Sequence, residues 1–246
     1  MKTVLVIPAR YNSTRLPGKP LLDIAGKPMI QRVFECAEKT KFSDIIIATD
    51  DSRIREVCEG FGADVCMTRS DHETGSDRLA EVVATRALSD DDIIVNLQGD
   101  EPLTPPANLH QVADNLLDHP EAMIATLCTP ISHPDEYGDP NVVKVVADVD
   151  GLALYFSRAS IPFQRDSDQD VTAHVKRHLG IYAYRAAFLK NFASMESCPL
   201  EQLEKLEQLR AMWYGNRIHV ADAKEIPGPG VDTAEDLAAL NALFVA

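Results

Sequence analysis

The sequence has few positive charges for its length. Its 246 residues carry 24 Lys and Arg against 38 Asp and Glu, which gives a formal net charge of -14. Nucleic acids and anionic membrane surfaces are held by an excess of Lys and Arg, so neither is an expected partner. Any anionic ligand therefore needs a local group of cations.

Paired cysteines and long apolar stretches are also missing. The five cysteines include no Cys-x-x-Cys pair of the kind that metal and redox sites use, and we expect them to be buried, reduced thiols. The apolar run at 4–8 is too short for a signal peptide, and no later stretch is long enough to cross a bilayer. We therefore predict a cytosolic protein.

Two common nucleotide-binding loops are absent. Gly18-Lys19 is followed by Pro20 and lacks the upstream glycine of a Walker A loop. No Gly-x-Gly-x-x-Gly follows the first apolar segment, which excludes a typical nicotinamide-dependent dehydrogenase.

Short apolar segments alternate with amphipathic ones over the first hundred residues. The Val- and Ile-rich segments 3–8, 44–50 and 92–97 have the pattern of parallel strands that are covered on both faces. Helices are predicted between and after them, over 28–40, 51–61 and 75–88. Such alternation predicts an α/β fold with an open, mostly parallel twisted sheet, and the length suits a single domain over 1–246 with one insertion.

The second half of the chain has a different pattern. Two β-rich segments within 142–157 flank the turn Asp148-Val149-Asp150-Gly151, which predicts a hairpin. A strand over 180–184, a helix over 200–214, a strand over 217–221 and a last helix over 233–244 are expected to follow. Most of the acidic face formed by Glu201, Glu204 and Glu207 is expected to be solvated.

Three cations follow the first predicted strand. Arg10, Arg15 and Lys19 lie within ten residues of an otherwise acidic chain. Their mutual repulsion is best offset by an anion of comparable charge, such as a triphosphate, which the loop amides would also bind. The alternative is a solvated basic loop.

Two aspartates are candidate metal ligands. Asp100 follows the third predicted strand, beside Gly99, where a carboxylate is well placed to hold Mg²⁺ against nucleotide phosphates. Asp232, in the glycine-rich loop before the last helix, is the candidate second ligand, with helix capping as its alternative role.

A third segment, 71–78, leads into a predicted helix. Ser76 or Asp77 is suited to capping this helix. The alternative is that the backbone around Gly75 and the side chain of Arg78 recognise the base of a nucleotide.

Several blocks of this sequence resemble the 3-deoxy-manno-octulosonate cytidylyltransferases, a family of sugar nucleotidyltransferases, and the similarity runs over essentially the whole chain. These blocks are Ile7-Pro8-Ala9-Arg10 with Arg15-Leu16-Pro17-Gly18-Lys19-Pro20, Asn96-Leu97-Gln98-Gly99-Asp100-Glu101-Pro102, Arg177-His178-Leu179-Gly180-Ile181-Tyr182 and Gly230-Val231-Asp232-Thr233. The resemblance implies a Rossmann-like nucleotidyltransferase fold, a homodimer, and an insertion at about 142–185 that contributes to the sugar site and the dimer. It also implies transfer of CMP from CTP to the anomeric hydroxyl of an acidic eight-carbon sugar, with Mg²⁺ as cofactor. Pyrophosphate would be released, and the activated sugar would serve lipopolysaccharide synthesis.

The resemblance also assigns roles by position. Arg10, Lys19 and Asp100 would be catalytic, and Asp100 and Asp232 would bind the metal. The residues implied to bind the nucleotide are Ala9, Arg10, Ser13, Arg15, Lys19, Ser76 and Arg78. The residues implied to bind the sugar are Gln98, His178, Tyr182, Glu207 and Gln208, with either Arg158 or Arg165 binding its carboxylate. His178 is equally open to a structural role in its strand.

One loop departs from the family pattern. It reads Thr74-Gly75-Ser76-Asp77-Arg78 in place of Ser-Gly-Thr-Glu-Arg, which leaves open an amino-substituted sugar such as the 8-amino analogue. Three rival functions also remain open. A sialic acid cytidylyltransferase would share the loop at 10–19, a glycosyltransferase would need an Asp-x-Asp motif that 98–101 matches poorly, and a non-catalytic protein would bind CTP without releasing pyrophosphate.

Overall fold

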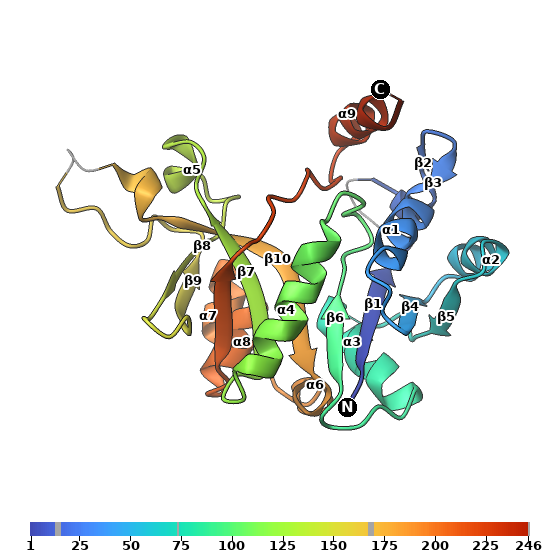
Figure 1. Ribbon diagram of the computed structural model, residues 1–246, viewed down its shortest axis with the longest axis horizontal. Helices are drawn as coiled ribbons and strands as arrows, with labels where there is room; N and C mark the ends of the chain where they lie inside the picture. The colour runs from blue at the N-terminus through green and yellow to red at the C-terminus, as the bar shows by residue number, and fades with distance from the viewer. Residues whose placement is uncertain (13–15, 73, 167–169, 246) are drawn as a thin grey trace.

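The protein is a mixed α/β structure, seen here in a computed structural model that describes residues 1–12, 16–72, 74–166 and 170–245 (Figure 1). The strands are β1 (Thr3–Ala9), β2 (Asp23–Ile24), β3 (Lys27–Pro28), β4 (Asp44–Thr49), β5 (Asp64–Met67), β6 (Ile93–Asn96), β7 (Ile124–Pro130), β8 (Lys144–Ala147), β9 (Ala153–Ser157), β10 (Lys176–Arg185) and β11 (Ile218–Asp222). The α-helices are α1 (Met29–Glu38), α2 (Ser52–Gly60), α3 (Gly75–Thr85), α4 (Pro106–Asp118), α5 (Asp135–Gly138), α6 (Ala186–Phe192), α7 (Pro199–Glu204), α8 (Gln208–Trp213) and α9 (Ala234–Val245), and short 3-10 turns lie at η1 (Lys19–Leu21) and η2 (Val171–Ala173).

A single large sheet forms the centre of the molecule. Within the described residues it has nine strands in the order β11-β7-β10-β6-β1-β4-β5, with β8 beside β10 and β9 beside β8. β6, β1, β4 and β5 are parallel to one another, and β11 is parallel to β7. β10 runs antiparallel between β6 and β7. The predicted α/β fold with a mostly parallel sheet is confirmed.

Helices cover both faces of this sheet because its strands are apolar on both sides. In β1, Leu5 and Ile7 pack with α1, α2 and α4, whereas Val4 and Val6 pack with α3, α6 and α8. All four side chains have no exposed surface. The two layers leave the carboxyl ends of the parallel strands uncovered by helix, which is where ligands gather in such sheets. α9 packs separately, against Ile24 and Met29 beside β2 and β3 (Figure 1).

The predicted insertion at about 142–185 needs a corrected boundary. Its first part is the expected hairpin, β8 and β9, with Gly151 at a left-handed φ of 76° in the turn. Its last part is β10, which is a central strand of the main sheet and no part of an insertion. The alternating burial along β10 reflects contacts with helices on both faces.

The predicted helix over 200–214 is wrong. It is broken into α7 and α8 at Lys205, whose backbone is left-handed with φ 53° and ψ 45°. The acidic residues there are not a solvated face either. Glu201 is buried in an ion pair with Arg210 (Nη2 to Oε1, 2.6 Å), and Glu204 accepts hydrogen bonds from Ser157 Oγ (2.6 Å) and Arg158 N (2.9 Å).

Other expectations are met by the described residues. All five cysteines are buried free thiols, as predicted. None of the helices described for this chain combines the length and apolar character of a membrane span.

Candidate active site

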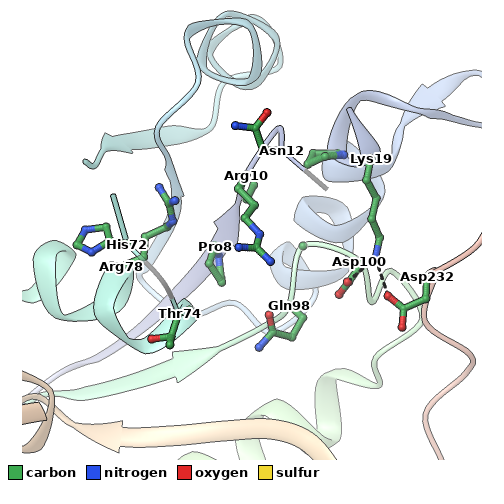
Figure 2. A pocket seen from close by; sticks show the side chains of 14 residues that line it. Pro8, Arg10, Asn12, Lys19, His72, Thr74, Arg78, Gln98, Asp100 and Asp232 are labelled. Atoms are coloured by element: carbon green, nitrogen blue, oxygen red, sulfur yellow. Dashed lines mark hydrogen bonds and ion pairs between the residues drawn. The ribbon is translucent and has the colours of Figure 1, made fainter. Parts of the chain in front are cut away.

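A cleft of about 380 Å³ opens at the carboxyl ends of β1 and β6, beside the start of α3 (Figure 2). We call it the charged cleft, because ionisable side chains supply much of its wall. Its lining residues are Pro8, Ala9, Arg10, Asn12, Lys19, Pro20, His72, Thr74, Gly75, Arg78, Gln98, Gly99, Asp100 and Asp232. Seven of the residues predicted to bind the nucleotide, the metal or the sugar therefore meet in one place: Ala9, Arg10, Lys19, Arg78, Gln98, Asp100 and Asp232.

The loop after β1 supplies two of the cations. Arg10 is exposed and forms no ion pair with any described residue. Lys19 follows Gly18, whose left-handed φ of 67° places the η1 turn against the cleft. A Cβ atom at Gly18 would also lie 3.2 Å from the Tyr11 ring, so the position requires glycine. Ser13 and Arg15, both predicted to bind the nucleotide, lie outside the described residues.

Lys19 joins the two predicted metal ligands. Its Nζ lies 2.6 Å from Asp100 Oδ2 and 3.1 Å from Asp232 Oδ1. Asp100 comes from the turn after β6, and Asp232 from the segment that precedes α9, more than a hundred residues later. The pairing of these aspartates, predicted from two separate motifs, is thus present. Within the described residues no cluster of three or more metal-ligating side chains occurs.

Gly99 fixes the distance between the two loops that carry these charges. A Cβ atom at this position would lie 2.7 Å from the carbonyl oxygen of Pro8, at the end of β1. The turn after β6 therefore approaches the β1 backbone more closely than a residue with a Cβ atom at position 99 would allow. This contact sets Asp100 against the loop that carries Arg10 and Lys19.

Glu101 belongs to the same charged centre and was missed by the sequence analysis. Burial, and then the nearby carboxylate of Asp100, raise its pKa to about 7, and Asp232 adds to the shift. Thr104 Oγ1 donates a hydrogen bond to its Oε2 at 3.2 Å. The only sequence signal was its place beside Asp100.

The start of α3 walls the other end of the charged cleft. Thr74 caps this helix: its Oγ1 accepts a hydrogen bond from Asp77 N, and Asp77 Oδ2 accepts one from Thr74 N, both at 3.2 Å. This reciprocal pair is a capping box. Asp77 therefore takes part in capping the helix, as expected, whereas Ser76 does not.

Arg78 is held in a fixed position at this end. It is only 4% exposed, and its guanidinium donates to Thr68 Oγ1 and lies 3.5 Å from Asp50 Oδ1. Asp50 directly follows β4 and Thr68 directly follows β5, so three elements meet here. The Asp50 carboxylate balances the charge of Arg78. The charge of Arg10 has no such carboxylate among the described residues.

A second cleft, of about 180 Å³, adjoins the first and shares Gly75 and Gln98 with it. We call it the aromatic cleft. The residues that line it are Gly75, Ser76, Asn96, Gln98, Ile124, Tyr182, Tyr184, Phe188, Phe192, Glu207, Gln208 and Ala211. Its aromatic rings follow one another, with centroids 5.5 Å apart for Tyr182 and Tyr184 and 6.1 Å apart for Tyr184 and Phe188. Four predicted sugar ligands, Gln98, Tyr182, Glu207 and Gln208, therefore come together.

Three buried polar atoms in the aromatic cleft have no hydrogen-bond partner among the described residues. They are Asn96 Oδ1, Glu207 Oε1 and Gln208 Nε2. Leaving such atoms unpaired is costly, so their concentration in one cleft indicates a polar ligand. Burial also raises the pKa of Glu207 to about 7. The break between α7 and α8 turns Glu207 and Gln208 into this cleft.

Three predicted sugar ligands lie elsewhere in this chain. His178, on β10, lines a separate cavity and packs against Phe156 and Tyr182. Its Nε2 lies 3.0 Å from Thr126 Oγ1, and burial lowers its pKa to about 3. Arg158 donates to Glu204 O (2.7 Å) and Pro140 O (2.8 Å), which ties the hairpin to α7 and withdraws its guanidinium from both clefts. Arg165 is exposed on the loop beyond β9 and lines neither cleft.

Comparisons with known proteins show the family to which the chain belongs. The family model for cytidylyltransferases matches residues 4–218. The chain is 57% identical to the 3-deoxy-manno-octulosonate cytidylyltransferase of Pseudomonas fluorescens, with 98% of each chain covered, and 56% identical to that of Aliivibrio fischeri, with 99% of each covered.

Solved structures give the same result. A CMP:2-keto-3-deoxy-manno-octonic acid synthetase complexed with CTP has a TM-score of 0.91 and 44% identity, covering 100% of this chain and 99% of its own. A 4-diphosphocytidyl-2C-methyl-D-erythritol synthase from Anaerococcus prevotii, with a TM-score of 0.64, 13% identity and coverage of 100% and 97%, shares the fold alone. The chain therefore belongs to the 3-deoxy-manno-octulosonate cytidylyltransferase family and is a sugar nucleotidyltransferase.

Proposed function

We propose that the protein transfers CMP from CTP to the anomeric hydroxyl of 3-deoxy-manno-octulosonate and releases pyrophosphate. The observation that carries this proposal is the junction of two unlike clefts at Gly75 and Gln98. One offers cations and carboxylates suited to a triphosphate, and the other offers rings and unpaired polar atoms suited to a sugar. The names of the relatives support the same substrates.

The charges along the charged cleft support one orientation of the nucleotide. Arg78 is balanced by Asp50, so its end of the cleft suits the uncharged base and ribose. Arg10 is exposed without an ion pair to any described residue, so its guanidinium is available to a phosphate group. CTP would lie with cytosine towards α3 and its phosphates towards Arg10 and Lys19.

Asp100 and Asp232 suit Mg²⁺, which prefers carboxylate oxygens and is usually held by one or two protein carboxylates. Burial is the largest cause of the raised pKa of Glu101, and the carboxylates of Asp100 and Asp232 add to it, so a divalent cation bound beside them would relieve part of this repulsion. When bound there, Mg²⁺ would neutralise charge on the phosphates during transfer.

The protein's own residues then act mainly by placing the two reactants. The sugar oxygen forms a bond to the α-phosphorus while the bond from that phosphorus to the pyrophosphate group breaks, and the hydroxyl proton is released. Such a transfer leaves the protein little covalent work, so position and electrostatic stabilisation dominate. Gln98, which lines both clefts, lies where the reactants would meet.

The aromatic cleft also favours the 8-amino analogue as a second candidate sugar. No cation lines this cleft within the described residues, and it contains the carboxyl group of Glu207. An ammonium group on the sugar would ionise that carboxyl and pair with it. Of the three positions that differ from the family pattern, Thr74 and Asp77 keep the capping box, so only Ser76 would adjoin a sugar bound in this cleft.

Pyrophosphate release by the purified protein with Mg²⁺ tests these proposals. CTP would be offered with the parent acid, its 8-amino analogue or a sialic acid, and ATP, UTP and GTP would serve as nucleotide controls. We expect release only with CTP and an eight-carbon sugar. Glu207→Gln should reduce activity with the 8-amino analogue more than with the parent acid. CTP binding without release for every sugar would refute the proposed reaction.

We also propose a homodimer formed through the hairpin. β9 pairs only with β8 among the described residues, and Leu154 on it is 61% exposed. An open, apolar strand edge invites pairing with a second copy. A monomer in light scattering at micromolar concentration would contradict the dimer. The cytosolic location stays a prediction.

A further inference from the structure

The ammonium group of Lys19 occupies the space between the two candidate metal ligands. It lies 2.6 Å from Asp100 Oδ2 and 3.1 Å from Asp232 Oδ1, and the dashed lines in Figure 2 mark both contacts. The Lys19 side chain is only 10% exposed, whereas the side chains of Asp100 and Asp232 are 36% and 55% exposed. The lysine thus approaches the pair from the protein side, and both carboxylates are more exposed than the lysine side chain.

A metal ion held by both aspartates would be repelled by Lys19 in this position. A divalent ion bound at the usual distance of about 2 Å from carboxylate oxygens would lie within a few ångströms of the ammonium group. Like charges that close repel strongly in a partly buried site. The two cations also draw on the same two carboxylates, so binding of the metal would weaken the contacts of Lys19 with them.

The charged cleft offers Lys19 a second place. The side chain already lines this cleft, together with Arg10, where the phosphates of the nucleotide are proposed to lie. A triphosphate would give the ammonium group new anionic partners in exchange for the aspartates. Without such an anion, moving Lys19 would leave a buried positive charge uncompensated, which is strongly unfavourable.

We propose that Lys19 is the resident counter-ion of Asp100 and Asp232, and that the metal binds as Lys19 exchanges these carboxylates for the phosphates of CTP. This inference rests on the proposed function, because it takes CTP as the arriving anion. Its consequence is positive coupling: the metal and CTP each increase the affinity for the other, by the same factor. The nucleotide-free protein should bind divalent metal weakly.

Binding of Mn²⁺ to the nucleotide-free protein, followed by electron paramagnetic resonance, tests the exchange. Lys19→Met keeps much of the side-chain length and removes the charge, and it should bind Mn²⁺ roughly ten-fold more tightly than the unchanged protein, an effect in the usual range of coupling between sites. Lys19→Arg keeps the charge and should bind Mn²⁺ as weakly as the unchanged protein. Equal or weaker binding by Lys19→Met would overturn the proposal.

Two further variants separate displacement from a general effect of charge. Arg10→Met removes a nearby cation that does not contact the aspartates, so it should change Mn²⁺ binding less than about three-fold, as expected for a screened charge. If it tightens binding as much as Lys19→Met, displacement is wrong. Adding Asp100→Asn to Lys19→Met should abolish the gain, and a gain that persists would place the metal elsewhere and overturn the proposal.

The coupling has its own measurement. Titration calorimetry gives the CTP affinity with and without Mg²⁺, and the ratio should be larger for the unchanged protein than for Lys19→Met. Equal ratios would refute the coupling. If no sugar supports pyrophosphate release but the Mn²⁺ results hold, the proposed reaction fails and the exchange stands. If pyrophosphate is released with CTP but Lys19→Met binds Mn²⁺ like the unchanged protein, the proposed reaction stands and the exchange fails.

Discussion

The charged cleft and the aromatic cleft meet at Gly75 and Gln98 but satisfy their polar groups in opposite ways. In the charged cleft the buried cations lie beside carboxylates, Lys19 beside two aspartates and Arg78 beside Asp50, although Asp50 Oδ1 accepts no hydrogen bond from the described residues. In the aromatic cleft Asn96, Glu207 and Gln208 each leave a buried polar atom without a hydrogen-bond partner in the part of the chain that the structure describes.

This difference indicates how each cleft recognises its ligand. A ligand of the charged cleft must exchange existing ion pairs, so its binding should depend strongly on salt and metal. A ligand of the aromatic cleft completes missing hydrogen bonds, so its binding should depend on shape and on the protonation of Glu207.

Asp100→Asn should have the largest effect, because Asp100 contacts Lys19 and is a proposed metal ligand. Loss of one well-placed electrostatic group typically costs about 3 to 4 kcal/mol, or 100- to 1000-fold in rate. The measurement is the rate of pyrophosphate release with CTP and the eight-carbon acid. Asp118→Asn, an exposed change at the end of α4, is the matched control and should leave the rate unchanged. Near-normal turnover by Asp100→Asn would remove Asp100 from the reaction.

Glu207→Gln should change the pH dependence of stability. The pKa of Glu207 rises from 4.5 to about 7 on folding, so between these values the unfolded chain is ionised while the folded protein keeps the proton. Stability contributed by the protonated group is full below the unfolded pKa and is lost as the pH rises through the folded one. Glutamine removes this loss, so above pH 7 the variant should gain up to about 3 kcal/mol, since each pKa unit corresponds to about 1.4 kcal/mol.

Thermal unfolding of Glu207→Gln and the unchanged protein at several pH values measures this gain. The two should unfold alike in acid and diverge as the pH rises. Glu196→Gln, on an exposed glutamate, should show no such divergence. A constant difference at all pH values would mean that Glu207 is not a buried titrating group, and the contrast between the clefts would weaken.

Gly99→Ala tests how closely the two loops of the charged cleft must approach. The added Cβ atom would lie 2.7 Å from Pro8 O, which is backbone and yields little. Overpacking of this kind costs about 1 to 3 kcal/mol. Displacement of Asp100 should lower kcat by about ten- to a hundred-fold, because small misplacements at a reacting centre are expensive. Gly60→Ala, where a Cβ meets nothing within 4 Å, should leave kcat unchanged.

Asp50→Ala tests whether Arg78 is positioned by its partners. Removal of the carboxylate that balances this buried guanidinium should raise KM for CTP by about ten-fold with a smaller change in kcat, as for a contact made equally in ground and transition states. Asp50→Asn keeps an oxygen acceptor and should recover part of the loss. Asp64→Ala, on an exposed partner of Arg86, is the control. If Asp50→Ala raised KM equally for CTP and UTP, Arg78 would have no role in recognising the base.

The strand ends and the charged cleft were predictable because their signals are local in the sequence. A run of Val and Ile marks each buried strand, and the polar residues that follow it must lie at the same edge of a parallel sheet. Asp100 carries this signal, whereas Asp232, 132 positions later, was proposed as the second metal ligand from its glycine-rich loop before the last helix. Asp50 carried the same signal, at the end of a predicted strand, but its bond to Arg78 depends on the packing of α3.

α4 and β7 were not predicted because their polar residues are buried. Asn108 and Gln111 point into the protein from α4, where Asn108 Nδ2 donates to Glu225 O (2.7 Å) and Gln111 Nε2 to Asp222 O (2.8 Å). Thr126 is buried in β7 beneath the irregular part of β10. Contacts with distant backbone satisfy these groups, and no pattern along the chain reveals such contacts.

The break at Lys205 is the feature of the aromatic cleft that the sequence conceals most. The residues around it favour a continuous helix, yet a left-handed Lys205 ends α7 and turns Glu207 and Gln208 into the cleft. This conformation costs an L-residue about 1 to 2 kcal/mol, and glycine avoids that cost while losing about 0.5 to 1 kcal/mol in unfolded-state entropy.

Lys205→Gly should therefore stabilise the protein slightly, by about 0.5 to 1 kcal/mol, and leave the sugar KM unchanged. Denaturant unfolding measures the gain, and Lys205→Ala, which keeps the strained backbone, should show none. If glycine instead raised the sugar KM, the lysine side chain itself would contribute to the aromatic cleft. If glycine destabilised the protein, the left-handed backbone at Lys205 would not be strained, because contacts between α7 and α8 would stabilise it. The buried ion pair between Glu201 and Arg210 would then be the next contact to test.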